Sequence, residues 1–431
     1  MKKILIIAGE PSADLHGANL VKAIRERVAQ NTPQTQGSSG RPASFTQERS
    51  AEPSPASVPG PLAQEGTEEI TKQAIEGIYK PDDVEFTGIG GRLMKEAGVN
   101  IIYDADKIAV VGISEVIKHL GMIRQAFQTV EALVHKEHID LAVLIDFPDF
   151  NLRLAKKLYK MQVPLVYYIS PQVWAWRKGR VKKIARYFKK ILVIFGFEES
   201  FYKNAGVDVK FVGHPLVKTV KMTKTKEELL KKYDIPAGTR TIAMLPGSRT
   251  AEVKRHLPIM LEAASRINKA YKELSFIVPV LSSQAGICTQ IVQAFDVPVK
   301  IIIDDTYNAV GMSEFAVVTS GTATLETALL GIPMVIVYKV SFLSHMVAKV
   351  MLSIDRIGII NIATGEDIVP ELVQSGLKPE TLANMMDRYL KDKGAYSTMK
   401  EGYLKLRNIL SDRDASEVAA YEIVNLLENA V

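Results

Sequence analysis

The sequence predicts an α/β protein with two Rossmann-like, doubly wound domains that face each other across a crevice. Short apolar runs alternate with helical patterns along the chain, which is typical of parallel strands joined by crossover helices. The series of alternating strands and helices in the first half of the chain is repeated in the second half. The length of 431 residues also favours two domains over one.

Each half of the chain contains a series of short apolar runs of the kind that form buried strands. In the first half they are Lys3–Ala8, Glu85–Ile89, Leu141–Ile145, Pro164–Ile169, Lys190–Ile194 and Val209–Val212. In the second half they are Thr241–Leu245, Ser275–Val280, Val299–Ile303, Phe315–Thr319 and Pro333–Tyr338. The repeated pattern predicts two sheets in tandem.

A segment after the first helix differs in composition from the rest. Gln30–Glu68 is rich in Pro, Ser, Gln, Gly and Thr and poor in apolar residues. Such a stretch buries too little apolar surface to offset the entropy of ordering the chain. We therefore predict that residues 31–80 form a disordered, low-complexity insertion.

The junction between the domains is expected near Gly213–Thr225, where Gly-His-Pro ends a strand and a lysine-rich helix begins. We assign residues 1–215 to the first domain and 216–412 to the second. The last helix, predicted at Ala415–Ala430, has apolar residues near helical spacing. Residues 413–431 are expected to pack back on the first domain.

Two apolar segments are expected to be structural rather than membrane-directed. Ile4–Ala8 follows two lysines but is too short for a signal peptide, and we expect a strand there. Val110–Val130 predicts an amphipathic helix, for which core packing is favoured over a lipid-facing role. No apolar run approaches the ~18 residues needed to cross a bilayer.

The rare residue types limit the chemistry. The single cysteine, Cys288, excludes a disulfide framework and a four-thiolate metal site, and it favours a reducing compartment. His16, His214 and His345 lack the spacing of metal ligands. We expect neither a metal nor a cofactor.

Positive charge is concentrated in one segment. The net charge is +6, and Arg177–Lys190 holds a dense run of lysine and arginine. Such a run suits phosphates on a membrane or nucleic acid, although a solvated helix face is an equal alternative. No nucleic-acid-binding motif accompanies it, so nucleic acid is not an expected partner.

Two loops in the second half are expected to bind phosphate. Pro246-Gly247-Ser248-Arg249 joins a strand to a helix, and Ser320-Gly321-Thr322 does the same further on. Helix N-termini and a forked arginine both hold anions. Glu326, one turn later, is suited to the hydroxyls of a ribose, although a buried capping glutamate is the alternative. Together the loops predict a nucleoside diphosphate site.

The strand Leu141–Ile145 leads directly into a pair of carboxylates. Asp146 and Asp149 lie three residues apart around a proline. Asp146 is predicted to be the general base that accepts a proton from an attacking hydroxyl. Asp149 is predicted to cap a helix that starts near Leu152.

Three further loops in the first half follow predicted strands. Gly9–Asp14 and Gly88–Gly91 are glycine turns that allow close approach of a ligand, or that serve geometry alone. Ser170–Arg177 contains both tryptophans of the chain. Two indoles beside an arginine suit a sugar or acyl group that carries negative charge, and a loop covering the core is an equal alternative.

Taken together, these motifs resemble the lipid-A-disaccharide synthase family in order and spacing. The resemblance rests on Gly9–Asp14, Gly88–Gly91, Val111–Val116, Asp146–Asn151, Ser170–Arg177, Phe211–Pro215, Leu245–Arg249 with Glu252 and Val253, and Ser320–Glu326. It covers nearly the whole chain outside the insertion.

The resemblance implies a GT-B glycosyltransferase of lipid A biosynthesis in Gram-negative bacteria. Such an enzyme is cytoplasmic and peripherally associated with the anionic surface of the inner membrane. It joins UDP-2,3-diacylglucosamine to 2,3-diacylglucosamine 1-phosphate with inversion, giving UDP and the beta-1,6-linked lipid A disaccharide 1-phosphate. The first domain would bind the acceptor and the second the UDP-sugar, and a homodimer is left open.

The resemblance also implies roles for individual residues. The catalytic residues fall on Asp146 and Arg249. The residues expected to bind the nucleotide sugar are Gly247, Ser248, Arg249, Ser320, Gly321, Thr322, Glu326 and Asn361. The residues expected on the acceptor side are Glu10, Ser12, Asp14, Glu115, Trp174, Trp176 and Arg177. The chain departs from the family pattern at Ala13, at Gly196 and at Ile359-Ile360, which precede Asn361.

Other enzymes of the same fold are the alternatives, namely the peptidoglycan lipid GlcNAc transferase and a UDP-GlcNAc 2-epimerase. An epimerase needs no lipid acceptor, so Ser170–Arg177 and the basic run after it argue against that reaction. A non-catalytic nucleotide-sugar-binding protein is a third alternative. The presence of both Asp146 and Arg249 disfavours it.

Overall fold

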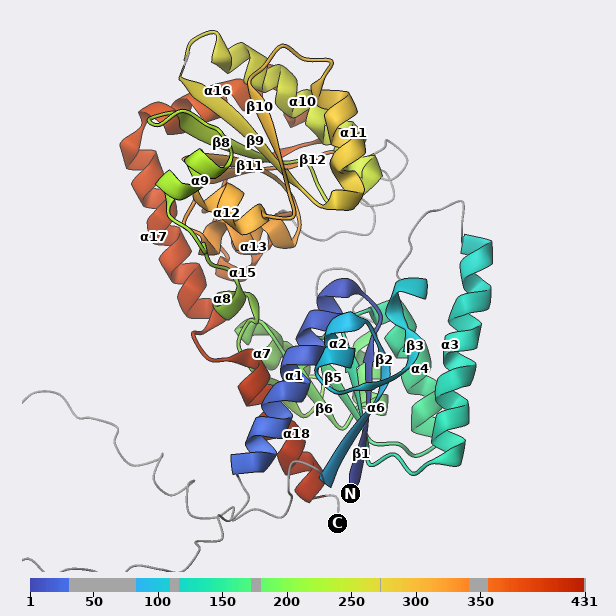
Figure 1. Cartoon of the computed structure of the whole chain (residues 1–431). Coiled ribbons are helices and arrows are strands. Elements are labelled where there is room, and N and C mark those ends of the chain that lie inside the picture. The colour runs from blue at the N-terminus through green and yellow to red at the C-terminus, as the bar shows by residue number, and fades with distance from the viewer. Residues whose placement is uncertain (31–82, 109–115, 172–179, 272, 341–355, 430–431) are drawn as a thin grey trace, which may run out of the picture. The chain divides into compact units, whose positions relative to one another are not determined.

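The computed structural model describes residues 1–30, 83–108, 116–171, 180–271, 273–340 and 356–429 (Figure 1). The predicted insertion at 31–80 lies outside these residues. Within them, no helix is both long enough and apolar enough to cross a membrane.

The first sheet contains seven strands in the order β3-β2-β1-β4-β5-β6-β7. Their bounds are β1 Lys2–Ala8, β2 Val84–Gly90, β3 Asn100–Asp104, β4 Leu141–Ile145, β5 Leu165–Tyr168, β6 Lys190–Val193 and β7 Val209–Phe211. The helices between them are α1 Pro11–Gln30, α2 Arg92–Glu96, η2 Ala105–Lys107, α3 Val116–Lys136, α4 Pro148–Lys160, α6 Arg180–Tyr187 and α7 Gly196–Lys203.

The second sheet contains six strands in the order β10-β9-β8-β11-β12-β13. They are β8 Arg240–Leu245, β9 Leu274–Val280, β10 Val299–Ile303, β11 Phe315–Thr319, β12 Met334–Tyr338 and β13 Glu371–Val373. The helices that follow β7 along the chain are α8 Leu216–Thr219, α9 Lys226–Lys232, α10 Thr250–Asn268, α11 Ser282–Val292, α12 Thr306–Gly311, α13 Thr322–Leu329, α15 Ile359–Thr364, η4 Gln374–Gly376, α16 Pro379–Lys391, α17 Lys393–Leu410 and α18 Ala415–Glu428.

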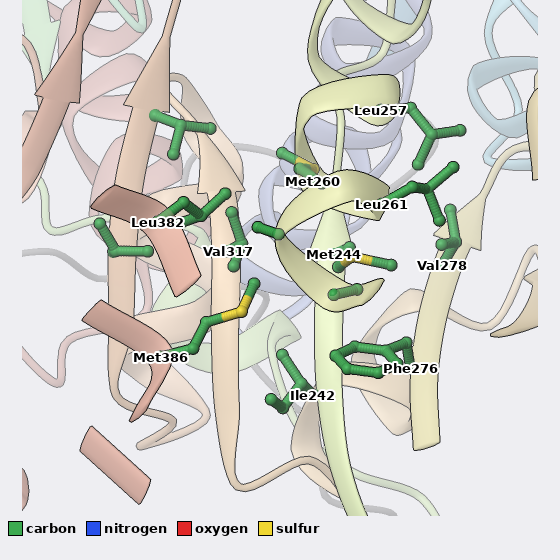
Figure 2. Packing of buried hydrophobic residues seen from close by; sticks show 14 of the residues in the cluster. Ile242, Met244, Leu257, Met260, Leu261, Phe276, Val278, Val317, Leu382 and Met386 are labelled. Atoms are coloured by element: carbon green, nitrogen blue, oxygen red, sulfur yellow. The ribbon is translucent and has the colours of Figure 1, made fainter. Parts of the chain in front are cut away.

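The second sheet is covered by helices on both faces because its strands are apolar on both faces. Ile242 and Met244 of β8 pack toward α10 and α16, whereas Ala243 and Leu245 pack in a separate cluster with α13 and α17. Figure 2 shows the first cluster, with Leu257, Met260 and Leu261 of α10 and Leu382 and Met386 of α16 beside the strands. Neighbouring residues of one strand thus contribute to two cores.

The prediction of two parallel α/β sheets is confirmed, and every predicted strand is present. The edge strands β3 and β13 were missed. β13 has only three residues, and β3 is exposed at both ends. Such short edge strands carry too few apolar residues to stand out in the sequence.

Two predicted helices differ in their bounds. The described part of the helix predicted at Val110–Val130 is α3, which continues to Lys136. Helix α4 begins at Pro148 rather than near Leu152, and its N-cap residue is Phe147. Asp149 therefore lies inside the first turn, and the prediction that it caps this helix is wrong.

The chain divides into two compact units, Met1–Ala142 with Ala420–Val431, and Val143–Ala419. The last helix thus contributes to the unit that contains the N-terminus. Within that unit, the guanidinium of Arg27 lies 4.7 Å from the ring centroid of Tyr421. The predicted junction at Gly213–Thr225 lies between β7 of the first sheet and β8 of the second.

Candidate active site

The strand order of the second sheet reverses between β8 and β11. These two strands are paired, with Val318 opposite Leu245 at their carboxyl ends. In doubly wound sheets, ligands bind outside the carboxyl ends of the strands at such a point. The loops Pro246–Arg249 and Ser320–Thr322 follow these two strands, so the topology brings the two predicted phosphate loops to the same place.

The loop after β8 requires glycine at position 247. Gly247 has a φ of +114°, and a Cβ there would lie 2.5 Å from Oε2 of Glu252. The carboxylate of Glu252 accepts hydrogen bonds from the backbone N–H of Arg249 at 3.3 Å and from its Nη1 at 3.1 Å. The Arg249 side chain is 75% exposed. Its remaining guanidinium donors are therefore open to an anion.

The loop after β11 leads into helix α13. Gly321 is its N-cap residue, and Thr324 donates through Oγ1 to the Gly321 carbonyl at 2.8 Å. The hydroxyl of Ser320 donates to the Ile357 carbonyl at 2.8 Å. Thr322 is exposed at the start of the helix. The N-terminus of α13 thus presents a hydroxyl and backbone N–H groups beside the β8 loop.

Glu326 lies on α13 beyond this loop. The hydroxyl of Tyr307 donates to its Oε1 at 3.1 Å. Burial raises the pKa of Glu326, and the hydrogen bond from Tyr307 opposes that shift. A carboxyl with a raised pKa close to a predicted phosphate loop is a candidate for a functional role. Glu326 is the fifth residue of the helix and bonds to a tyrosine, so it does not cap α13.

Asn361 is buried and bonded through both ends of its amide. Its Nδ2 donates to the Val369 carbonyl at 2.7 Å and to Oε1 of Glu371 at 2.8 Å, while its Oδ1 accepts from the Val369 N–H at 3.0 Å. Glu371 also accepts from the N–H groups of Ile357 and Gly358. The Ile357 carbonyl in turn accepts the hydrogen bond of the Ser320 hydroxyl. Asn361 and Glu371 therefore hold the segment to which Ser320 of the β11 loop is bonded.

Asp146 lies at the carboxyl end of β4 in a strained turn. Asp146 and Phe147 have φ values of 46° and 45°, a conformation that costs roughly 1–2 kcal/mol per residue without glycine. The Asp146 carbonyl accepts from Nδ2 of Asn151 at 2.7 Å and from the Tyr167 hydroxyl at 3.0 Å. Strain that is held by several partners is typical of active sites.

The acceptor-side residues within the described chain have different surroundings. The carboxylate of Asp14 is buried and accepts from the N–H groups of Gly91, Leu93 and Met94 at 2.7 to 3.2 Å, which caps α2 and joins the two glycine turns. Glu10 is partly buried and Ser12 is exposed. Ala13 lies in α1, where helical backbone accepts alanine.

Four acceptor-side predictions fall outside the described residues. They are Glu115, Trp174, Trp176 and Arg177. Their roles remain predictions from the sequence.

Comparison with known proteins decides the family. The family model of lipid-A-disaccharide synthetase matches residues 63–422. The lipid-A-disaccharide synthase of Geobacter sulfurreducens is 36% identical over 100% of this chain and 98% of its own length. That of Syntrophus aciditrophicus is 37% identical over 100% of this chain and 99% of its own. The chain belongs to the lipid-A-disaccharide synthase family.

Solved structures show the fold of this family member to be GT-B. A UDP-GlcNAc 2-epimerase from Neisseria meningitidis bound to UDP-GlcNAc has a TM-score of 0.61 and 9% identity, covering 99% of this chain and 100% of its own. A glycosyltransferase from Rickettsia africae has a TM-score of 0.53 and 13% identity, covering 100% and 98%. At these identities the likeness concerns the fold alone, whereas membership of the lipid-A-disaccharide synthase family makes the chain a glycosyltransferase.

Several residues around the loops of this glycosyltransferase carried no signal in the sequence. Asn151 also holds one of these loops, but it stands within the Asp146–Asn151 motif and could be found from the sequence. Tyr167 and Glu371 each reach a loop in another element, and His256 joins the nearby Pro246 to Lys339, 83 residues away. Only strand pairing brings such residues to the loops they contact.

Proposed function

We propose that the protein joins UDP-2,3-diacylglucosamine to 2,3-diacylglucosamine 1-phosphate, forming beta-1,6-linked lipid A disaccharide 1-phosphate and UDP. The observation that supports this proposal is the pairing of β8 with β11 in a chain of this family, because the two predicted phosphate loops follow these strands. The diphosphate of UDP is the ligand these loops suit.

In the proposed donor site, the diphosphate lies between the β8 and β11 loops. Arg249 contributes a forked cation, and Gly247, Ser248, Ser320, Gly321 and Thr322 supply close backbone approach and hydroxyl groups. Glu326 accepts hydrogen bonds from the ribose hydroxyls. Asn361 acts by holding the segment on which Ser320 rests.

In the proposed reaction, Asp146 accepts the proton of the acceptor 6-hydroxyl. The oxygen then bonds to the anomeric carbon from the face opposite UDP, and the bond from that carbon to the diphosphate breaks, which inverts the configuration. Negative charge grows on the departing UDP. Arg249 and the N-terminus of α13 stabilise this charge without a metal.

The proposed membrane contact uses the basic face of α6. Val181 and Ile184 are buried, whereas Lys182, Lys183 and Lys189 are exposed on and just after the helix. Anionic headgroups attract such a surface. Apolar residues of the first domain are proposed to add to this attraction, because a small cationic patch alone anchors weakly.

Product analysis with three sets of substrates distinguishes the proposed reaction from its alternatives. Radiolabelled UDP-2,3-diacylglucosamine and 2,3-diacylglucosamine 1-phosphate should give a labelled disaccharide 1-phosphate together with UDP. Incubation with UDP-GlcNAc alone should give no UDP-ManNAc. Formation of UDP-ManNAc would establish an epimerase instead, and transfer of GlcNAc to a peptidoglycan lipid would establish the other transferase.

A further inference from the structure

His256 lies on α10, and its ring contacts residues at or just after the carboxyl ends of β8, β11 and β12. The side chain is completely buried. Its Nδ1 lies 3.1 Å from the Pro246 carbonyl oxygen and 3.3 Å from Oγ1 of Thr319. Its Nε2 accepts from the Lys339 N–H at 3.0 Å. One imidazole therefore contacts the segments that follow β8 and β12 and the last residue of β11.

The partners of the ring determine its protonation. The Pro246 carbonyl can only accept, which favours a hydrogen on Nδ1, while Nε2 lies 3.0 Å from the Lys339 N–H, which can only donate, and 3.2 Å from the Lys339 carbonyl oxygen, which can only accept. A neutral ring with its hydrogen on Nδ1 satisfies the Pro246 carbonyl and the Lys339 N–H together. Burial lowers the pKa of His256, in agreement with this form. A charged ring would lose the hydrogen bond from the Lys339 N–H, and its second N–H would have the Lys339 carbonyl as its partner instead.

Two of these contacts involve the residues that come just before the two proposed phosphate loops. Pro246 precedes Gly247 and Arg249, and Thr319 precedes Ser320. A movement at either contact would change the distance between the guanidinium and the start of α13. A site of this kind works best when its donors are already in place, because ordering them during binding costs affinity.

We propose that His256 is a positioning residue for the nucleoside diphosphate, holding the β8 and β11 loops at the separation that the diphosphate requires. It touches neither the ligand nor the reacting atoms. The inference rests on the proposed function for the identity of the donor. The contacts themselves come from the fold, and UDP alone is a sufficient probe.

Two substitutions separate the hydrogen bonds of the ring from its bulk. His256→Leu keeps an apolar side chain of similar size and removes every hydrogen bond. His256→Asn can still donate from Nδ2 to the Pro246 carbonyl, but its shorter side chain does not bring Oδ1 to the position of Nε2, so the hydrogen bond from the Lys339 N–H is lost. Met260→Leu, also buried on α10, is the matched control for a general packing change in this helix.

Calorimetry with UDP on the full-length variants is the decisive measurement, with melting temperature and steady-state kinetics beside it. For His256→Leu we expect Kd for UDP and KM for the donor to rise roughly tenfold, since two buried groups lose their partners, while kcat falls less. For His256→Asn we expect a rise of about threefold, because the Pro246 contact is retained and the Lys339 contact is lost. Met260→Leu should bind UDP as the wild type does.

Each contrary outcome has a definite meaning. Unchanged UDP affinity in a folded His256→Leu variant would overturn the inference, and so would an equal loss in Met260→Leu. If His256→Leu does not fold, an Asn variant that loses about threefold affinity for UDP at an unchanged melting temperature supports it, and one that binds UDP as the wild type does overturns it. Failure of the wild type to bind UDP would instead overturn the proposed function.

Discussion

At the scale of single residues, the site combines strain with support. Asp146 follows β4 in a left-handed backbone conformation, which is unfavourable for residues other than glycine. Asn151 and Tyr167 donate hydrogen bonds to its carbonyl and hold it in place. Arg249 is the opposite case, because it is exposed and tied only at one end by Glu252. The backbone of the proposed base, Asp146, is thus held in place. The side chain proposed to bind phosphate, Arg249, can instead change its conformation.

Replacing Asp146 with asparagine should lower kcat by ~10²-fold or more, because an amide cannot accept the proton. The size of the side chain is kept, so UDP affinity and melting temperature should stay near those of the wild type. Steady-state kinetics with both lipid substrates and calorimetry with UDP check this expectation. Activity within a few-fold of the wild type would remove Asp146 from the role of base.

Replacing Arg249 with alanine should weaken UDP binding as well as turnover, since the guanidinium meets phosphate in both states. A charged hydrogen-bonded contact of this kind is worth ~2–3 kcal/mol. Lysine should restore only part of the loss because it lacks the planar fork. Calorimetry is the test, and an alanine variant with unchanged UDP affinity would place the phosphates elsewhere.

The acid stability of the chain should depend on His16. Burial lowers the pKa of His16 from 6.5 to about 4, so the folded protein disfavours the charged ring. The associated stability is complete above the unfolded pKa, is lost as the pH falls from about 6.5 toward about 4, and is absent below that. At pH 5 the loss amounts to up to about 2 kcal/mol.

The control for this prediction is His16→Gln, which does not titrate. Urea unfolding at pH 7 and pH 5 should show a smaller decrease in the free energy of unfolding for the variant than for the wild type. Equal decreases in the two proteins would mean that His16 does not contribute to acid sensitivity.

At the scale of elements, the strongest features are central and the weakest lie at edges. β8 and β11 are central, apolar and directly followed by the proposed phosphate loops. β3 and β13 are edge strands, and β13 nevertheless carries Glu371, which supports Ser320 through Ile357. A short edge strand can therefore matter to a site that it does not line.

Deletion of Gln34–Gly66 should leave activity and melting temperature almost unchanged. The stretch has few apolar residues, and removing a long surface insertion costs little free energy. Thermal unfolding and the transferase assay check this prediction. A decrease in melting temperature of more than about 5 °C would show that the segment packs on the body of the protein.

At the scale of the whole molecule, charge is distributed unevenly. The net charge is +6, and the exposed cations of α6 concentrate part of it on one surface. Both proposed substrates carry acyl chains that reside in a membrane, so this surface is the proposed place of contact. Attraction of this kind weakens with salt, because the Debye length falls to about 8 Å at physiological ionic strength.

Replacing Lys178, Lys182, Lys183 and Lys189 with glutamine should reduce sedimentation with anionic vesicles at low salt, while activity on detergent-dispersed substrates survives. Glutamine at Lys226, Lys231, Lys232 and Lys269 removes the same charge elsewhere and is the control. Wild-type sedimentation of the first variant would mean that this run is a solvated helix face.

The sequence by itself determined the two sheets, the central strands and the loops at their carboxyl ends. Buried parallel strands must be apolar throughout, and the turns after β8 and β11 take glycine where φ is positive, so both features are encoded in the local sequence. The family motifs added the identities of Asp146 and Arg249, whose roles remain predictions.

Only the tertiary structure decided which residues hold those loops. The contact of His256 with Pro246 and Lys339, that of Glu371 with Ile357, and that of Tyr167 with Asp146 join different elements of the fold. The strained turn at Asp146 and the enclosed amide of Asn361 were likewise invisible in the sequence. Hydrogen bonds of this kind depend on which strands are neighbours, and a local pattern does not encode that order.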